Sequence, residues 1–416
     1  MTHPALRRTT ASRKKDRREF TGGRWQRARM LASVETGRAL PTAARDVNAD
    51  AATSDPLAFF MKQGTSFFLD TLRAASALGV FAGHCLMPWF SSLDSGRHWE
   101  IGRHACVVVF FVLSGYLITY TTVGRGRTWR QYVAARLARL YSVALPALVV
   151  TAALWLIGGA LAPAHYADFD RGHDALRFVA TAFFLNETWF FSAAPPTNMP
   201  FWSLAYEFWY YAIFGAAFFA RGRIWSWVAP LLAALICGPK VLLLFPVWLA
   251  GSAAFFAGKK FALSPGWTGF GLAVLGGICA AGAPRVGIPL EQFGHPPLFF
   301  SGLFWSDIAL GVVLAAAIFF CDQLFGNARV PAAMGVPVKA FAGVTFSIYL
   351  LHFPLLIFAS AIVPYDKSNP VAVAGVGCAV LLTAIALGYG FERRATLKAL
   401  SGWIESAFAK MGRGAP

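Results

Sequence analysis

Long apolar stretches constrain the fold of this chain more than any other feature. A helix needs about twenty mostly apolar residues to cross the hydrocarbon core of a bilayer, and about ten segments come near that length. The sequence therefore predicts an all-α integral membrane protein with about ten transmembrane helices. The predicted spans are roughly 67–90, 104–123, 140–161, 203–220, 224–238, 240–257, 267–283, 304–321, 339–363 and 371–391.

Composition supports a membrane protein and argues against a nucleic-acid partner. Hydrophobic residues make up 57% of the 416 and charged residues only 14%, whereas a soluble domain carries about a quarter charged residues. The net charge of +17 would suggest nucleic-acid binding in a soluble chain. Here the bases lie in short runs between apolar stretches, so membrane topology explains them better.

The charge pattern also predicts domains and sidedness. Residues 1–56 are rich in Lys and Arg and predict a basic, disordered cytoplasmic tail. Residues 57–395 form the predicted transmembrane domain, and 396–416 a short cytoplasmic C-terminal tail. With both termini inside, most of the basic loops fall on the cytoplasmic side, as the positive-inside rule requires.

Cysteine spacing predicts neither a metal site nor a disulfide framework. The six cysteines lie singly, mostly within apolar segments, and form no C-x-x-C pair. We expect small core residues and no bound metal.

A few ionisable side chains lie at predicted membrane depth, where a charge is expensive and therefore marks a functional candidate. Arg73 and His84 are eleven residues apart, which is three helical turns, so they share one face about 16 Å apart. By their distances from the span ends, Glu207 and His352 fall in the same outer layer as His84. Arg73 lies near the inner end of its span.

Five ordered motifs resemble the membrane acyltransferase-3 family over residues 65–395. They are Leu69-Asp70-Thr71-Leu72-Arg73 followed by His84, Phe110 to Ile118, Arg136-Leu137-Ala138-Arg139, Trp202 to Glu207, and Ser347 to Pro354. Thr71, Val108 and the pair Ala205-Tyr206 depart from the residues that are usual in the family.

The resemblance implies a membrane-bound O-acyltransferase. Such an enzyme moves an acyl group, usually acetyl, from cytoplasmic acyl-CoA to a hydroxyl of a cell-surface or lipid-linked glycan at the bacterial inner membrane. It also implies that Arg73 and His84 are the family's essential Arg-x10-His pair and that Arg136 and Arg139 are its Arg-x-x-Arg pair.

Elementary chemistry agrees with this assignment. Acyl transfer to an alcohol needs a base for the hydroxyl proton, and the imidazole of His84 suits that role at neutral pH. Glu207 is the carboxylate expected to orient it. The phosphates of coenzyme A favour a basic entry formed by Arg73, Arg136 and Arg139. A passage would then join these arginines to His84.

Acceptor binding is predicted at Trp202 and Ser203, with Tyr349 and His352. Trp202 would stack on a sugar, although membrane interfaces also attract Trp for other reasons. His352 would bind the acceptor or shuttle a proton, and interhelical bonding is its structural alternative. Ser114-Gly115 is interpreted as a close helix contact rather than a catalytic motif.

Alternatives remain open at this point. Transfer through an acylated His84 uses the same residues as direct transfer. A polytopic glycan or proton-coupled transporter also uses intramembrane His, Glu and Arg, although the sequence shows no repeated halves. A sensor or scaffold with a vestigial site is the third possibility.

Overall fold

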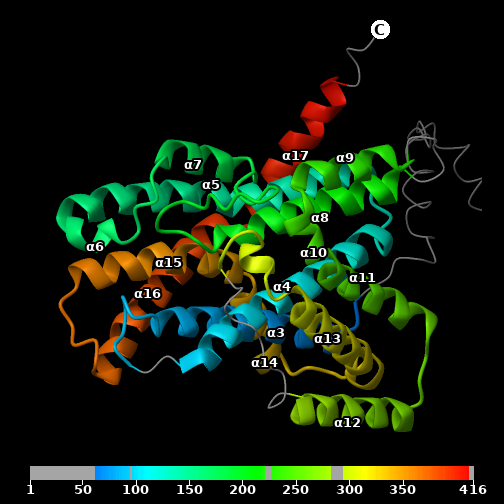
Figure 1. Ribbon diagram of the computed structural model, residues 1–416. Coiled ribbons are helices and arrows are strands. Elements are labelled where there is room, and N and C mark those ends of the chain that lie inside the picture. Colours follow the sequence, from blue (N-terminus) through cyan, green and yellow to red (C-terminus); the bar gives the residue numbers. More distant parts are fainter. Residues whose placement is uncertain (1–60, 94–95, 221–225, 283–293, 412–416) are drawn as a thin grey trace, which may run out of the picture. The chain divides into compact units, whose positions relative to one another are not determined.

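The computed structural model describes residues 61–93, 96–220, 226–282 and 294–411, and within these ranges the chain forms only helices, turns and loops (Figure 1). The predicted all-α class is therefore confirmed for the described residues. The predicted tail, 1–56, lies outside them. Most of the predicted C-terminal tail forms a helix, α17 (Arg394–Met411).

The long helices follow the predicted apolar segments. They are α3 (Gln63–Cys85), α4 (Gly96–Val123), α5 (Trp129–Leu161), α8 (Phe201–Phe219), α11 (Phe245–Lys260), α12 (Pro265–Gly282), α13 (Phe304–Phe325), α15 (Thr345–Ile362) and α16 (Pro370–Phe391). Shorter helices are α6 (Pro163–Ala167), α7 (Asp174–Ala182), α9 (Val228–Cys237), α10 (Pro239–Leu243), α14 (Ala332–Ala342) and the 3₁₀ turn η3 (Phe299–Ser301).

Six described helices are long and apolar enough to cross a membrane, so the predicted number of ten is not confirmed. They are α4, α5, the α10–α11 pair, α13, α15 and α16. The segments predicted at 67–90, 203–220, 224–238 and 267–283 also form helices, but these are not among the six. Helix α3 contains Asp70, Arg73 and other polar residues, α8 contains Glu207 together with several Tyr and Trp residues, and α9 has only 10 residues. The protein is a multi-pass membrane protein.

Outward-facing apolar side chains agree with a lipid surround. Val149 on α5, Leu231 on α9 and Leu382 on α16 are 69%, 68% and 65% exposed in the isolated chain. Soluble monomers seldom expose large continuous apolar patches, whereas lipid tails accept them.

Two helices form the centre of the fold. α4 packs against α3, α8, α11 and α13, and α15 packs against α3, α5 and α16. Gly115 on α4 and Gly251 on α11 permit a close approach, because a Cβ on either would overlap a backbone carbonyl of the other helix. Gly115 thus has the helix-packing role that was predicted for the Ser114-Gly115 motif.

One helix break agrees with the predicted spans, and a second corrects them. The spans predicted at 224–238 and 240–257 meet at the first break. Gly238 separates α9 from α10 with a φ of 82°, a left-handed conformation that favours glycine. The span predicted at 339–363 is divided, because α14 ends before Gly343 and α15 begins at Thr345.

The six cysteines are all free, and only Cys237 is fully buried. Cys279 and Cys378 are exposed, so the predicted core role does not apply to them. Both lie on helices with outward-facing apolar residues.

Candidate functional site

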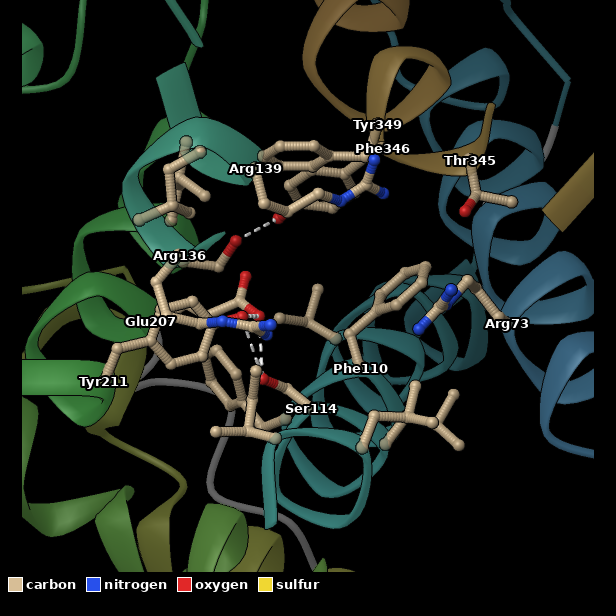
Figure 2. A pocket seen from close by; sticks show the side chains of 18 residues that line it. Arg73, Phe110, Ser114, Arg136, Arg139, Glu207, Tyr211, Thr345, Phe346 and Tyr349 are labelled. Carbon is tan, nitrogen blue, oxygen red and sulfur yellow. Dashed lines mark hydrogen bonds between the residues drawn. The ribbon is translucent and has the colours of Figure 1, made fainter. Parts of the chain in front are cut away.

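A cavity of about 150 Å³ lies between α3, α4, α5, α8 and α15, and we call it the arginine cavity (Figure 2). Its lining combines three arginines with one carboxylate, two tyrosines and apolar side chains. The lining residues are Arg73, Val107, Phe110, Phe111, Leu113, Ser114, Leu117, Ile118, Arg136, Arg139, Leu140, Ser203, Leu204, Glu207, Tyr211, Thr345, Phe346 and Tyr349.

The structure brings together the three arginines predicted from sequence. Arg73 comes from α3, while Arg136 and Arg139 are three residues apart on α5, so they project from neighbouring turns (Figure 2). Arg136 stacks over the rings of Tyr132 and Tyr211. Its Nε is buried and has no hydrogen-bond partner among the described residues. A buried donor without a partner in a cavity wall indicates a position for a ligand.

Arg139 differs because it already has a carboxylate partner. Its guanidinium donates to Glu392 at 2.5 Å, and the other oxygen of Glu392 accepts the backbone N–H of Ser347 at 2.8 Å. Glu392, at the end of α16, therefore ties α5 to the first turn of α15. No sequence motif pointed to it.

Glu207 lies with the arginines, away from His84. Its Oε1 accepts a hydrogen bond from Ser114 Oγ at 2.7 Å and another from the Tyr211 hydroxyl. Ser114 Oγ in turn accepts the indole N–H of Trp248 at 3.1 Å. The predicted contact between Glu207 and His84 is absent from the described residues. Sequence depth placed both in one layer, but depth carries no information on which way a helix face points.

His84 instead contacts His352. The Nδ1 of His84 lies 3.0 Å from the Nε2 of His352 and 2.9 Å from the backbone oxygen of Val80. His352 is fully buried, and its Nδ1 lies 3.0 Å from the backbone oxygen of Ile348. Phe353 meets the His84 ring edge to face.

These contacts assign the protons on both neutral rings. A carbonyl oxygen only accepts, so His352 carries its proton on Nδ1 and offers a lone pair at Nε2. His84 likewise carries its proton on Nδ1, which it donates to Val80 and His352. The lone pair of His84 is then on Nε2, which has no hydrogen-bond partner among the described residues. His352 thus occupies the orienting position predicted for Glu207.

A second cavity of about 80 Å³ contains His84, and we call it the histidine cavity. In place of the single predicted passage, the arginine cavity and the histidine cavity are separate, and Val107 and Tyr349 line both. The residues that line the histidine cavity are Val80, His84, Met87, Arg103, His104, Val107, Met199, Pro200, Trp202, Phe300, Tyr349 and Phe353.

The predicted acceptor residues are divided between the cavities: Ser203 lines the arginine cavity, Trp202 the histidine cavity and Tyr349 both, while His352 lines neither. The hydroxyls of Ser203 and Tyr349 are hydrogen bonded at 2.7 Å. Trp202 is only 5% exposed, and Phe300 stacks on its indole with centroids 4.4 Å apart. Stacking of a sugar on that face would require Phe300 to move, so burial rather than a platform describes Trp202 here.

Several site residues escaped the sequence analysis. Ser114 was interpreted as packing, yet its hydroxyl bonds Glu207 and Trp248 in the arginine cavity. His104 was not among the predicted site residues, yet it is buried on α4 with its Nε2 2.9 Å from both oxygens of Asp307. Both residues are polar positions on the largely apolar helix α4, and this pattern was the sequence signal that could have identified them.

The described residues contain no group of three or more His, Cys, Asp or Glu side chains arranged to hold a metal ion. Among known families, the acyltransferase-3 model, described as an acyltransferase domain, matches residues 66–389. No curated protein and no solved structure matches the chain. The match covers nearly all of α3, every described helix from α4 to α15 and nearly all of α16.

Proposed function

The chain belongs to the acyltransferase-3 family and is a membrane acyltransferase, and we propose that it transfers an acyl group, usually acetyl, from cytoplasmic acyl-CoA to a hydroxyl of a cell-surface or lipid-linked glycan. The bacterial inner membrane is the proposed location. The observation that carries the proposal is the His84–His352 pair, which leaves one imidazole lone pair available beside a cavity.

His84 acts as the general base at Nε2. The acceptor hydroxyl gives its proton to Nε2 while its oxygen forms a bond to the thioester carbonyl carbon. The carbon–sulfur bond then breaks, and the proton passes from the imidazolium to the departing thiolate. Positive charge develops on His84 during attack, and the Val80 carbonyl and the His352 lone pair both stabilise it through Nδ1–H.

The same geometry accommodates an acylated His84. In that route Nε2 attacks the thioester and releases the CoA thiolate. In a second step the acceptor oxygen attacks the acyl carbon, the bond to Nε2 breaks, and the hydroxyl proton passes to the thiolate. Both routes need the proton held on Nδ1, so both depend on His352.

Donor binding is proposed at the arginine cavity. Arg73 and Arg136 have no carboxylate in contact among the described residues, and Arg136 retains an unpartnered buried donor. Guanidinium groups bind phosphate through paired hydrogen bonds, so these residues suit the phosphates of coenzyme A. Glu207 holds one negative charge among three cations and keeps the Ser114 and Tyr211 hydroxyls in place.

Acceptor binding is proposed at the histidine cavity, which Trp202 and Tyr349 line. Ser203 bonds Tyr349 from the arginine cavity, and His352 contacts His84. Transfer brings the reacting atoms to about 3–3.5 Å, so the wall shared by the two cavities opens during the reaction. Tyr349 lines both sides of that wall.

The test is mass spectrometry of surface glycans from cells that lack the protein and from cells that carry wild type, His84→Ala or His165→Gln. His165 bonds Ser360 on α15 and lines neither cavity, so it is the matched histidine control. We expect esters with wild type and His165→Gln and none with His84→Ala. A null strain with unchanged esters, or full restoration by His84→Ala, overturns the proposal.

Donor dependence requires a second measurement on purified protein. Reconstituted wild type should release free CoA thiol from acetyl-CoA when glycan acceptor is added, and His84→Ala should not. Ester formation that consumes no acyl-CoA contradicts the proposed donor.

A further inference from the structure

Arg103 lies beside His84 in the histidine cavity, and neither the motifs nor the proposed chemistry uses it. It belongs to α4, and its side chain is 16% exposed. Its aliphatic stem lies against Gly83, where an added Cβ would come within 3.1–3.3 Å of Arg103 Cβ, Cγ and Cδ. The glycine that precedes His84 therefore makes room for this arginine.

The described partners of the Arg103 guanidinium are weak. One terminal nitrogen lies 3.0 Å from the sulfur of Met87, and a thioether is a poor acceptor. The other lies 3.5 Å from Glu100, whose side chain is 46% exposed. A guanidinium carries five N–H donors, so these two contacts leave most of its capacity unused.

The charge of the cavity lining favours an anion. Among the described residues that line the histidine cavity, Arg103 is the only one with a permanent charge, and none carries a carboxylate. The nearby imidazole of His104 already donates to Asp307, which lies outside the lining. A positively charged, under-used guanidinium in a small cavity attracts an oxyanion.

We propose that Arg103 binds an oxyanion of the acceptor, a carboxylate or a phosphate, so that the acceptor is an anionic glycan. This rests on the proposed function, because it names the substrate class of the same site. The donor phosphates are assigned to the arginine cavity, beyond Val107 and Tyr349. Arg103 and His84 line one cavity of about 80 Å³, so the esterified hydroxyl lies on the anionic sugar or its direct neighbour.

The position of the ester provides the first test. Glycans from cells that carry wild type are mapped by tandem mass spectrometry and NMR. We expect the ester on a sugar that bears a carboxylate or phosphate, or on the adjacent sugar. An ester surrounded by neutral sugars overturns the role of Arg103 but leaves the acyltransferase function intact. Absence of any ester overturns the proposed function itself.

Purified protein in lipid nanodiscs provides the second test. The probes are the mapped glycan fragment, the same fragment after carboxyl reduction and the same fragment after phosphatase treatment. A hydrogen bond to a charged group contributes enough that Arg103→Gln should raise the acceptor KM about 10- to 100-fold. The acyl-CoA KM and kcat should change less than about twofold, which separates binding from a general loss of structure.

Variants at the same place give the controls. Arg103→Lys keeps the positive charge but lacks the planar guanidinium that donates paired hydrogen bonds, so it should recover part of the acceptor affinity that Arg103→Gln loses. Glu100→Gln removes the weak competitor and should not raise the acceptor KM. With the wild-type enzyme, one of the two treated fragments should show the same rise in acceptor KM as Arg103→Gln shows with the untreated fragment. A rise after carboxyl reduction identifies a carboxylate, and a rise after phosphatase treatment identifies a phosphate. Equal KM values for all three probes overturn the proposal.

Discussion

The orienting role of His352 gives the sharpest prediction for the chemistry. His352→Phe keeps an aromatic ring in a fully buried position but removes the acceptor for the Nδ1–H of His84. Val80 remains as the other acceptor, at 2.9 Å. The variant therefore loses one hydrogen bond to an imidazole that becomes charged in the transition state.

A hydrogen bond to a charged group is worth about 1.5–3 kcal/mol. Since about 1.4 kcal/mol is a tenfold change in rate, kcat of His352→Phe should fall about 10- to 100-fold. The acyl-CoA KM should stay within about twofold, because His352 is absent from the arginine cavity. His352→Gln offers an amide oxygen in place of Nε2 and should recover part of kcat.

The assay is release of free CoA thiol from acetyl-CoA by protein in nanodiscs, with thermal unfolding measured in parallel. The control is His165→Gln, which removes the hydrogen bond from His165 on α6 to Ser360; Ser360 lies on α15, the helix that also carries His352. The reasoning is refuted if His352→Phe retains kcat within about twofold while His84→Ala is inactive. The reasoning is also contradicted if kcat of His352→Phe falls only in proportion to the amount of folded protein, because a purely structural role of His352 predicts that result.

Four further changes test other parts of the site and fold. Arg136→Ala should raise the acyl-CoA KM about 10- to 100-fold, and a KM equal to that of wild type contradicts donor binding at Arg136. Arg139→Ala should raise this KM and also lower the unfolding temperature, because it leaves Glu392 buried without its cation. Gly115→Ala forces a Cβ into the α11 backbone and should destabilise the fold by about 1–3 kcal/mol. Gly159→Ala meets open space and should stabilise it by up to about 1 kcal/mol, as measured by thermal unfolding.

Sequence predicted well what depends on local hydrophobicity. Apolar segments located the helices, because burial in lipid requires a continuous apolar run whatever the tertiary packing. The number of spans stays a prediction, because polar residues such as Glu207 in α8 interrupt some of these helices, and hydropathy cannot separate a lipid-facing helix from one enclosed by protein.

The site shows a similar division between what spacing determines and what packing determines. The resemblance to the family's Arg-x-x-Arg pair implied that Arg136 and Arg139 act together, and a separation of three residues on a helix is enough to bring them into one cavity. The contact between His84 and His352 spans 268 residues, and it depends on how α3 and α15 are rotated about their axes. No local pattern encodes that rotation, so Glu207 was assigned from sequence as the partner of His84, whereas the structure places a second imidazole there.

The separation of the two cavities has a consequence for how transfer is coupled. A donor bound by Arg136 and an acceptor beside His84 meet only if the wall lined by Val107 and Tyr349 moves. Tyr349 is held by one hydroxyl–hydroxyl hydrogen bond to Ser203, which contributes only about 0.5–1.5 kcal/mol. We therefore expect rotation of the Tyr349 side chain to take part in joining the cavities. A closed wall also separates water molecules beside His84 from the thioester until the acceptor is present. This separation limits hydrolysis of the donor.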